Sequence, residues 1–103
     1  MAYTITLRPE ARQELLDLYL YIAEQAGDAR ALGYVSGIRQ MINGLAEFPR
    51  RGTERTDMLP GLRIIGYKRS ASIAFVVDAT EVIVLGVFYG GRDVTADLLD
   101  ERL

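Results

Sequence analysis

The sequence predicts an α+β fold with an N-terminal strand and an antiparallel helical hairpin packed on one face of a mainly antiparallel sheet of about four strands. Two periodicities support this fold class: apolar residues recur at helical spacing between residues 9 and 48, and they alternate from residue 62 onward. Glycine and proline mark the points where the pattern changes. We expect residues 1–103 to form a single domain, since half of them are hydrophobic and a chain of this length buries roughly two-thirds of its unfolded surface.

The N-terminal segment predicts a short strand followed by a long helix. Residues Tyr3–Leu7 alternate between large apolar side chains and threonines, as in a strand with one buried face. Pro9 suits the first turn of a helix, which we expect over Pro9–Ala26 with an apolar stripe of Ala11, Leu15, Leu18 and Ile22. The opposite side carries Glu10, Glu14, Asp17 and Glu24. Paired carboxylates can serve acid–base chemistry or hold a metal, but we interpret these as a solvated helix face.

A second helix is predicted directly after the first. Gly27 is a typical C-terminal glycine and Asp28 a good N-cap, so the turn between the helices is very short. We expect Gly33 and Gly37, four residues apart, to let another backbone approach closely. The residue before a proline disfavours helical geometry, so the helix should close at Phe48-Pro49. Its inner stripe consists of Leu32, Val35, Ile38, Ile42 and Leu45.

The rest of the chain predicts a meander of three strands, at Leu62–Lys68, Ser72–Val77 and Val82–Tyr89. Pro60-Gly61 forms a turn before the first, and Arg69–Ala71 and Asp78–Glu81 link the others. The last strand is apolar on both faces and should be internal, with Ile83, Leu85 and Val87 on one face and Val82, Val84, Gly86 and Phe88 on the other. We expect Val77, Val84 and Leu85 to pack against the helical hairpin. Gly90-Gly91 ends the strand, and residues 94–103 form a short acidic tail with a turn or two of helix through Leu98 and Leu99.

Charge is distributed unevenly along the chain. The whole chain has a net charge of −2, yet the segment from Arg50 to Arg69 holds six basic and two acidic residues, a local net charge of +4. This asymmetry indicates either a surface for an anionic or acidic partner or a solvated loop that happens to be basic.

Composition excludes several classes of site. The chain has no cysteine and no histidine, which removes disulfides, the usual zinc and haem sites, and Ser-His or Cys-His nucleophile pairs. No apolar run approaches the roughly 20 residues that a membrane helix needs, and the N-terminus is too short and polar for a signal peptide. We therefore expect a cytoplasmic protein without a cofactor, a metal or a membrane segment.

Four segments, taken in order, carry a resemblance to a known family. They are PEARQELLDLYLYIAEQ, LAEFPRRGTE, PGLR, and the closing strand followed by Gly91-Arg92-Asp93. Together they cover about Leu7 to Asp93 and resemble the ParE branch of the RelE/ParE toxin family. The resemblance implies a small bacterial toxin of a type II toxin–antitoxin system, silent while bound in a hetero-oligomer with a cognate antitoxin from the adjacent gene. It also implies one of two targets: ParE-type toxins inhibit DNA gyrase, whereas RelE-type toxins cut messenger RNA on the ribosome.

The same five residues serve either function. Metal-free RNA cleavage needs a general base, cations that stabilise the phosphorane, and a proton donor. Arg63, Lys68, Arg69 and Arg92 are the candidate cations, and Tyr89 is the candidate donor. However, the tail after Arg92 contains no tyrosine or histidine, and the negative net charge is unsuited to neutralising several phosphates. We therefore favour a gyrase inhibitor with no catalytic residue, in which these five side chains bind the partner and no sequence-specific nucleic acid is bound.

Departures from the family pattern leave alternatives open. Phe75-Val76 stands where the family often has Tyr-Arg, which predicts deeper burial of that strand, and Tyr89 replaces a common histidine. Tyr67 is a second candidate for the acid of a nuclease. A third class of function is a toxin fold that acts only as a binding partner. In each case we expect an apolar groove, between the sheet and the hairpin, that the C-terminal segment of the antitoxin fills as a helix or an added strand.

Overall fold

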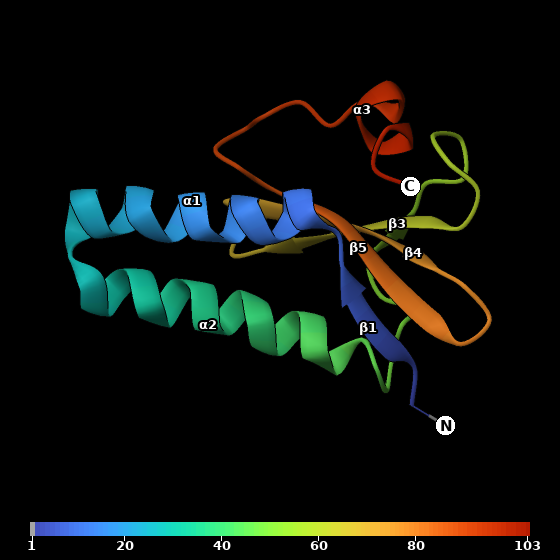
Figure 1. Cartoon of the computed structure of the whole chain (residues 1–103), viewed down its shortest axis with the longest axis horizontal. Coiled ribbons are helices and arrows are strands. Elements are labelled where there is room, and N and C mark those ends of the chain that lie inside the picture. Colours follow the sequence, from blue (N-terminus) through green and yellow to red (C-terminus); the bar gives the residue numbers. More distant parts are fainter. Residues whose placement is uncertain (1) are drawn as a thin grey trace.

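The computed structural model describes residues 2–103 and confirms the α+β fold (Figure 1). Two long antiparallel helices lie against one face of a sheet, and a short third helix follows the last strand. The elements are β1 (Thr4–Leu7), α1 (Pro9–Ala26), α2 (Asp28–Gly44), β2 (Thr53–Glu54), β3 (Leu62–Tyr67), β4 (Ala71–Val77), β5 (Glu81–Tyr89) and α3 (Ala96–Asp100).

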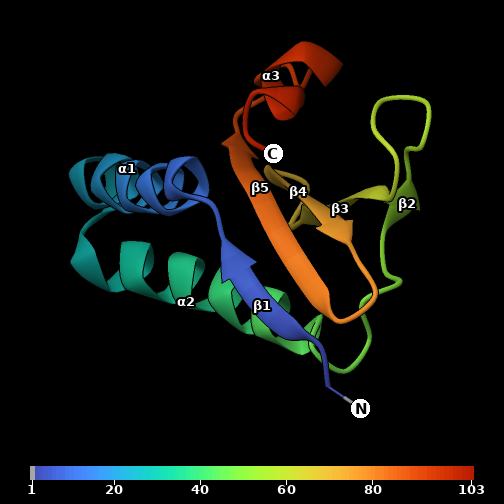
Figure 2. The same cartoon turned by 45° about the vertical axis from the view of Figure 1, so that its right-hand side comes forward.

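The sheet has five strands in the order β1-β5-β4-β3-β2, rather than the expected four or so. The additional strand, β2, is only two residues long and pairs with the start of β3. Two residues are too few to show the alternation of apolar and polar side chains by which a strand is predicted. Strands β3, β4 and β5 form the predicted antiparallel meander. The N-terminal strand β1 pairs in parallel with the first half of β5, as Figure 2 shows, and β5 is therefore internal there, as predicted.

The helical hairpin begins and turns where the sequence predicted, but two details differ. Pro9 occupies the first turn of α1, and Gly27 joins the helices with a φ of 94°. Gly27 is also the N-cap of α2, whereas Asp28, the predicted cap, is already the first helical residue and its side chain makes no capping bond. Helix α2 ends at Gly44 rather than near Phe48, because glycine favours helix poorly. Residues 45–47 continue as a tighter turn, in which each N–H donates to the carbonyl three residues earlier.

The main core lies between the hairpin and the sheet. It contains Leu15 and Leu18 of α1, Val35, Ile38, Ile42 and Leu45 of the α2 segment, and Phe75 and Val84 of the sheet, with Ile22 and Val77 partly buried against them. Leu32 was predicted to belong to this core, but its side chain is 60% exposed. Ala31 takes the inner position instead, since it lies one helical turn before Val35 and two before Ile38.

A β-bulge changes which face the last strand presents. The register between β4 and β5 shifts at Ala74/Phe75, so that Leu85 has no direct partner. Beyond this point Val87 packs on the hairpin side and Phe88 on the opposite side, the reverse of the strict alternation predicted from the sequence. Leu85 is buried as predicted, but it packs on the face away from the hairpin.

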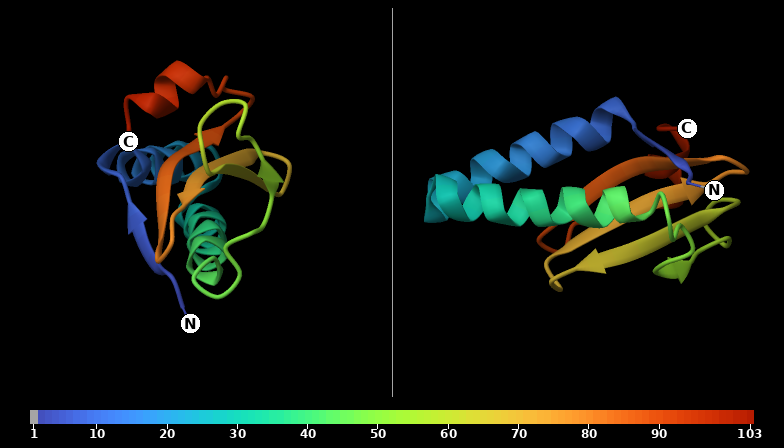
Figure 3. Two further views of the ribbon diagram at one scale, coloured as in Figure 1. Left: turned by 90° about the vertical axis from the view of Figure 1, so that its right-hand side faces the viewer. Right: turned by 90° about the horizontal axis from the view of Figure 1, so that it is seen from below.

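The face away from the hairpin has a core of its own, covered by α3 and the loop before β3. Leu99 of the predicted tail helix is fully buried there with Leu59, Leu62, Ala74, Leu85 and Phe88. The Thr95 side chain accepts a hydrogen bond from the Leu98 N–H (3.2 Å) and caps α3. Between residues 2 and 103, no helix combines the length and apolar character that a membrane span requires. Figure 3 shows the two long helices reaching well beyond one end of the sheet.

Candidate functional site

Arg63 lies apart from the other candidate residues. It is near the start of β3, whereas Lys68 and Arg69 follow the end of that strand, roughly 16 Å away at 3.3 Å per residue. The Arg63 guanidinium donates to Glu54 Oε2 and to the Arg51 carbonyl, both at 3.4 Å. Arg63 therefore links β3 to β2 and the loop before it.

The basic segment Arg50–Arg69 consequently forms no single patch. Besides the Arg63–Glu54 pair, Arg55 binds both carboxylate oxygens of Asp57 at 3.0 Å, and these hydrogen bonds lower the pKa of the Asp57 carboxyl. The two acidic residues of the segment are thus each paired with one of its arginines. Lys68 and Arg69 form no ion pair within residues 2–103 and lie at the other end of β3.

Lys68 and Arg69 occupy the tip of the turn between β3 and β4, one residue earlier than the predicted turn. Both are exposed, and both have positive φ, 49° and 60°. The Ser70 N–H donates to the Tyr67 carbonyl at 3.1 Å and closes the turn. The Lys68 Nζ lies 5.6 Å from the centroid of the Tyr67 ring, within range of a cation–π contact.

Four tyrosines form a cluster beside this turn, which we call the tyrosine cluster: Tyr21 of α1, Tyr34 of α2, Tyr67 of β3 and Tyr89 of β5. The Tyr34 ring meets the Tyr67 ring edge-on at 5.1 Å and the Tyr89 ring at 5.9 Å, and Tyr89 also contacts Tyr21 at 5.9 Å. The Tyr34 hydroxyl is buried, and burial raises the pKa of this phenol. The candidate residue Tyr89 is thus held between two other rings.

The absence of a side chain at Gly37 leaves the space that the Tyr67 ring of this cluster occupies. A β-carbon at position 37 would collide with the Tyr67 hydroxyl, whereas one at Gly33 would meet nothing within 4 Å. The prediction that both glycines admit a neighbouring backbone is therefore wrong. Gly37 instead admits an aromatic side chain from the sheet, and Gly33 faces open space.

Arg92 and Tyr89 border a pocket of about 180 Å³ between α1 and the end of β5. Tyr21, Leu18 and Val87 supply its apolar walls, and Glu14 and Asp17 supply carboxylates. The Gly90 N–H donates to the Ser70 carbonyl at 3.1 Å, which fixes this pocket next to the Lys68-Arg69 turn. The structure thus brings four of the five candidates, all but Arg63, to one end of the sheet.

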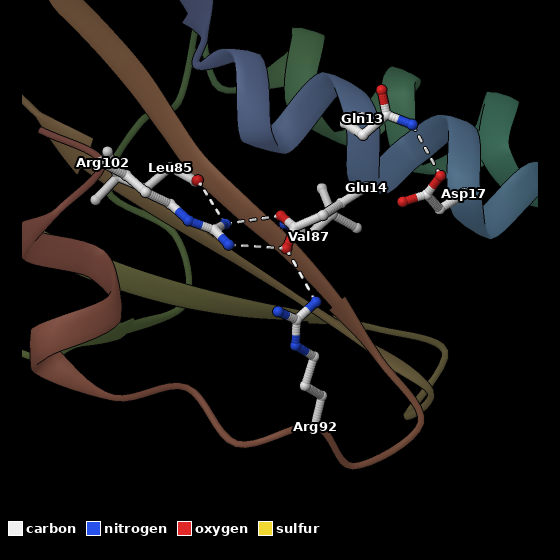
Figure 4. A network of polar contacts seen from close by, with 7 residues as sticks. All are labelled: Gln13, Glu14, Asp17, Leu85, Val87, Arg92 and Arg102. Atoms are coloured by element: carbon white, nitrogen blue, oxygen red, sulfur yellow. Dashed lines mark hydrogen bonds and ion pairs between the residues drawn. The ribbon is translucent and has the colours of Figure 1, made fainter.

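Glu14 joins Arg92 to a network that the sequence did not reveal (Figure 4). Its Oε1 atom accepts from Arg102 Nη1 (2.8 Å) and from the Val87 N–H (3.0 Å), and its Oε2 atom accepts from Arg102 Nη2 (3.1 Å) and Arg92 Nη1 (3.2 Å). The Glu14 side chain is only 10% exposed. The prediction that it lies on a solvated helix face is wrong.

The network exists because β1 covers only part of β5. The parallel pairing ends at Leu7 and Val84, so the following edge of β5 faces α1 rather than a strand. Glu14 accepts the N–H that this edge exposes at Val87, and Arg102 donates to the Leu85 carbonyl at the bulge (3.1 Å). Arg102, the one basic residue of the acidic tail, thus has a structural role that was missed because its partner is 88 positions away.

The assembled end of the sheet is suited to binding. It presents the two exposed cations Lys68 and Arg69, the half-exposed Arg92 and the edge of the tyrosine cluster.

Among residues 2–103, no group of three or more acidic side chains is arranged to hold a metal ion.

Comparison with known proteins identifies relatives of the whole fold. A family model described as the ParE toxin of the type II toxin–antitoxin system, parDE, matches residues 5–94. The toxin ParE3 of Caulobacter vibrioides is 26% identical over 98 residues, which are 95% of this chain and 96% of that protein. A solved structure of the chromosomal ParDE toxin–antitoxin system from P. aeruginosa superposes with a TM-score of 0.74 at 22% identity, over 85% of this chain and 96% of that one.

Proposed function

The chain belongs to the ParE toxin family of type II toxin–antitoxin systems, and from this premise we propose that it inhibits DNA gyrase by binding it. In this proposal a cognate antitoxin from the adjacent gene binds the toxin in a hetero-oligomer and neutralises it. The protein acts in the cytoplasm, where its target handles chromosomal DNA, and it uses no cofactor.

The arrangement of the candidate residues is the observation that supports binding over cleavage. Lys68 and Arg69 are exposed at the tip of a turn, whereas Tyr89, the candidate proton donor, is packed between two rings. Arg92 is already bound to Glu14, and Arg63 lies at the other end of its strand. A nuclease needs its donor and cations around one phosphate, while a docking surface needs only exposed, spaced contacts.

The alternative function is a RelE-like, ribosome-dependent messenger RNA endonuclease. One contact favours it: the Lys68 ammonium lies 5.6 Å from the centroid of the Tyr67 ring, so a cation and a tyrosine are neighbours at this end of the sheet, although the Tyr67 hydroxyl points to Gly37 of α2. In that function Tyr67 would replace Tyr89 as the proton donor.

The apolar surface of the hairpin supports the antitoxin interaction. Leu16 and Leu20 of α1 and Leu32 of α2 are each more than half exposed, although large apolar side chains usually avoid water. We propose that the antitoxin's C-terminal segment covers them. Co-purification with the product of the adjacent gene should yield a stable complex, and Leu16→Glu should weaken it without unfolding the toxin.

Expression of the toxin alone in bacteria tests the proposed target. Gyrase inhibition predicts filamentous cells with an induced DNA-damage response, and co-expression of the adjacent gene should restore growth. Rapid arrest of translation with cleaved transcripts, and no DNA-damage response, would support the endonuclease instead.

A further inference from the structure

The turn between β3 and β4 has an unusual sequence for its backbone. Its two central residues, Lys68 and Arg69, both adopt left-handed conformations, with φ of 49° and 60°. Positive φ at both central residues is typical of a type I′ turn, which strongly prefers Asn-Gly or Gly-Gly because other side chains clash with the backbone there. Lysine and arginine carry a β-carbon that crowds the backbone in the left-handed conformation, so this turn is strained at two successive residues.

The surrounding structure holds the strained turn in place. The Ser70 N–H donates to the Tyr67 carbonyl (3.1 Å), and the Ser70 hydroxyl donates to the Lys68 carbonyl (3.2 Å). The Ser70 carbonyl in turn accepts from the Gly90 N–H (3.1 Å), which fastens the turn to the end of β5. Both charged side chains nevertheless remain exposed and form no ion pair within residues 2–103. The turn therefore displays two available cations on adjacent residues.

A strained conformation that persists at an exposed turn calls for a role of the side chains themselves. We infer that Lys68 and Arg69 bind an acidic surface of the target protein, an inference that rests on the proposed gyrase inhibition. Two adjacent cations match two carboxylates of a protein partner through charge-assisted hydrogen bonds. The edge of the tyrosine cluster, including the Tyr67 ring beneath Lys68, adds aromatic contact area beside them.

The number of available cations favours a protein over a nucleic acid. Nucleic-acid binding relies on neutralising several phosphates, and proteins that do so carry extended basic surfaces. At this end of the sheet the third cation, Arg92, is bound to Glu14, and the net charge of the chain is −2. Two cations suit a short acidic segment of a protein better than a duplex.

The double substitution Lys68→Asn/Arg69→Gly separates the role of the side chains from the stability of the turn. It installs the pair that this turn prefers and removes both charges. We expect the Tm to rise by roughly 4 °C or more, while the concentration needed to inhibit gyrase supercoiling rises about tenfold or more. Affinity for the antitoxin should be unchanged. A variant that inhibits gyrase as well as the wild-type protein would overturn the inference.

Two further variants control for net charge and for the strain of the turn. Arg12→Gln/Arg39→Gln removes two exposed helix charges from the hairpin and should leave inhibition unchanged, which controls for net charge. Lys68→Ala/Arg69→Ala removes the same two charges as the turn variant but keeps the strain, and it should lose inhibition to the same extent. Full inhibition by the alanine variant would also contradict the inference.

The wild-type protein distinguishes failure of the inference from failure of the proposed function. Wild-type protein that leaves gyrase active contradicts the proposed function and the protein target together. Inhibition by wild type and by the Asn-Gly variant alike overturns only the role of the turn. If the wild-type protein binds a short DNA duplex and the Asn-Gly variant does not, the turn contacts nucleic acid and the inference is wrong.

Discussion

Arg102 and Glu14 form a bidentate ion pair that joins the C-terminal tail to the first helix. Nη1 and Nη2 of Arg102 lie 2.8 and 3.1 Å from the two carboxylate oxygens, and both side chains are at least 90% buried. The same guanidinium lies 5.3 Å from the Phe88 ring and donates to the Leu85 carbonyl. This pair therefore holds the tail, the bulge of β5 and helix α1 together.

Removing Arg102 should destabilise the protein strongly. Arg102→Ala leaves Glu14 buried with only the exposed Arg92 as a charged partner and leaves the Leu85 carbonyl without its donor, so we expect a loss of about 3 kcal/mol in urea unfolding. Arg92→Ala is the matched control, because Arg92 contacts the same carboxylate but is 53% exposed. It should cost less than about 1 kcal/mol. Equal, small effects of the two substitutions would show that the buried pair contributes little.

Gly33 and Gly37 of α2 should respond in opposite directions to substitution by alanine. Gly33→Ala meets nothing within 4 Å and should stabilise the helix by about 1 kcal/mol. Gly37→Ala collides with the Tyr67 hydroxyl and should cost about 1–3 kcal/mol. Adding Tyr67→Phe to Gly37→Ala removes the colliding oxygen and should recover part of the loss. Thermal unfolding of the three variants measures this, and the same shift for both glycines would contradict the packing described here.

Two apolar residues of α2 test where the core lies. Ile38 is fully buried and Leu32 is 60% exposed, although both were predicted to face the sheet. Ile38→Asp places an unpaired carboxylate in the core and should leave the domain unfolded by circular dichroism. Leu32→Asp should fold with nearly wild-type stability. A folded, soluble Ile38→Asp protein would refute the position of the helical hairpin.

Burial of Tyr34 predicts a pH effect on stability. The pKa of the Tyr34 phenol is raised in the folded protein above its ordinary value of 10.0, mainly by burial. Above pH 10 the unfolded chain loses this proton while the folded chain keeps it, so the contribution to stability is complete below pH 10 and is lost as the pH rises through the folded pKa. In a titration followed by ultraviolet absorbance, one of the six tyrosines should lose its proton at a pH above the ordinary pKa of 10.0. The Tyr34→Phe substitution should abolish this high-pH phase. A titration unaffected by Tyr34→Phe would contradict this environment.

Local signals in the sequence account for most of the fold. Pro9 at the start of α1, Gly27 between the helices and Gly90 after β5 each have a conformational reason that needs no distant partner. The alternation of apolar residues also located β3, β4 and β5 to within one residue at each end. Such signals are strong because they depend on the backbone preferences of single residues.

The features that the sequence did not reveal depend on distant partners. The bulge at Leu85 arises from pairing with β4, and it reverses the faces of Val87 and Phe88 without any mark in the pattern of β5. Glu14 looked like a solvated acidic residue because its partners, Arg102 and the Val87 N–H, lie more than 70 positions away. The candidate site likewise divided at Arg63, which lies at the start of β3 while Lys68 and Arg69 follow its end. The predicted bounds of this strand implied the separation, whereas the net charge counted along the segment did not.

Purified components test most sharply whether this toxin inhibits gyrase by binding it. The toxin should be added to a gyrase supercoiling reaction and, separately, to ribosomes programmed with a messenger RNA. We predict inhibition of supercoiling, reversed by the cognate antitoxin, with the messenger RNA intact. Substituting either Lys68 or Arg69 alone should weaken inhibition partly, as expected for single contacts in an interface, rather than abolish it. Cleavage of the messenger RNA that disappears on Lys68→Ala/Arg69→Ala, with supercoiling unaffected, would show that the toxin is an endonuclease instead.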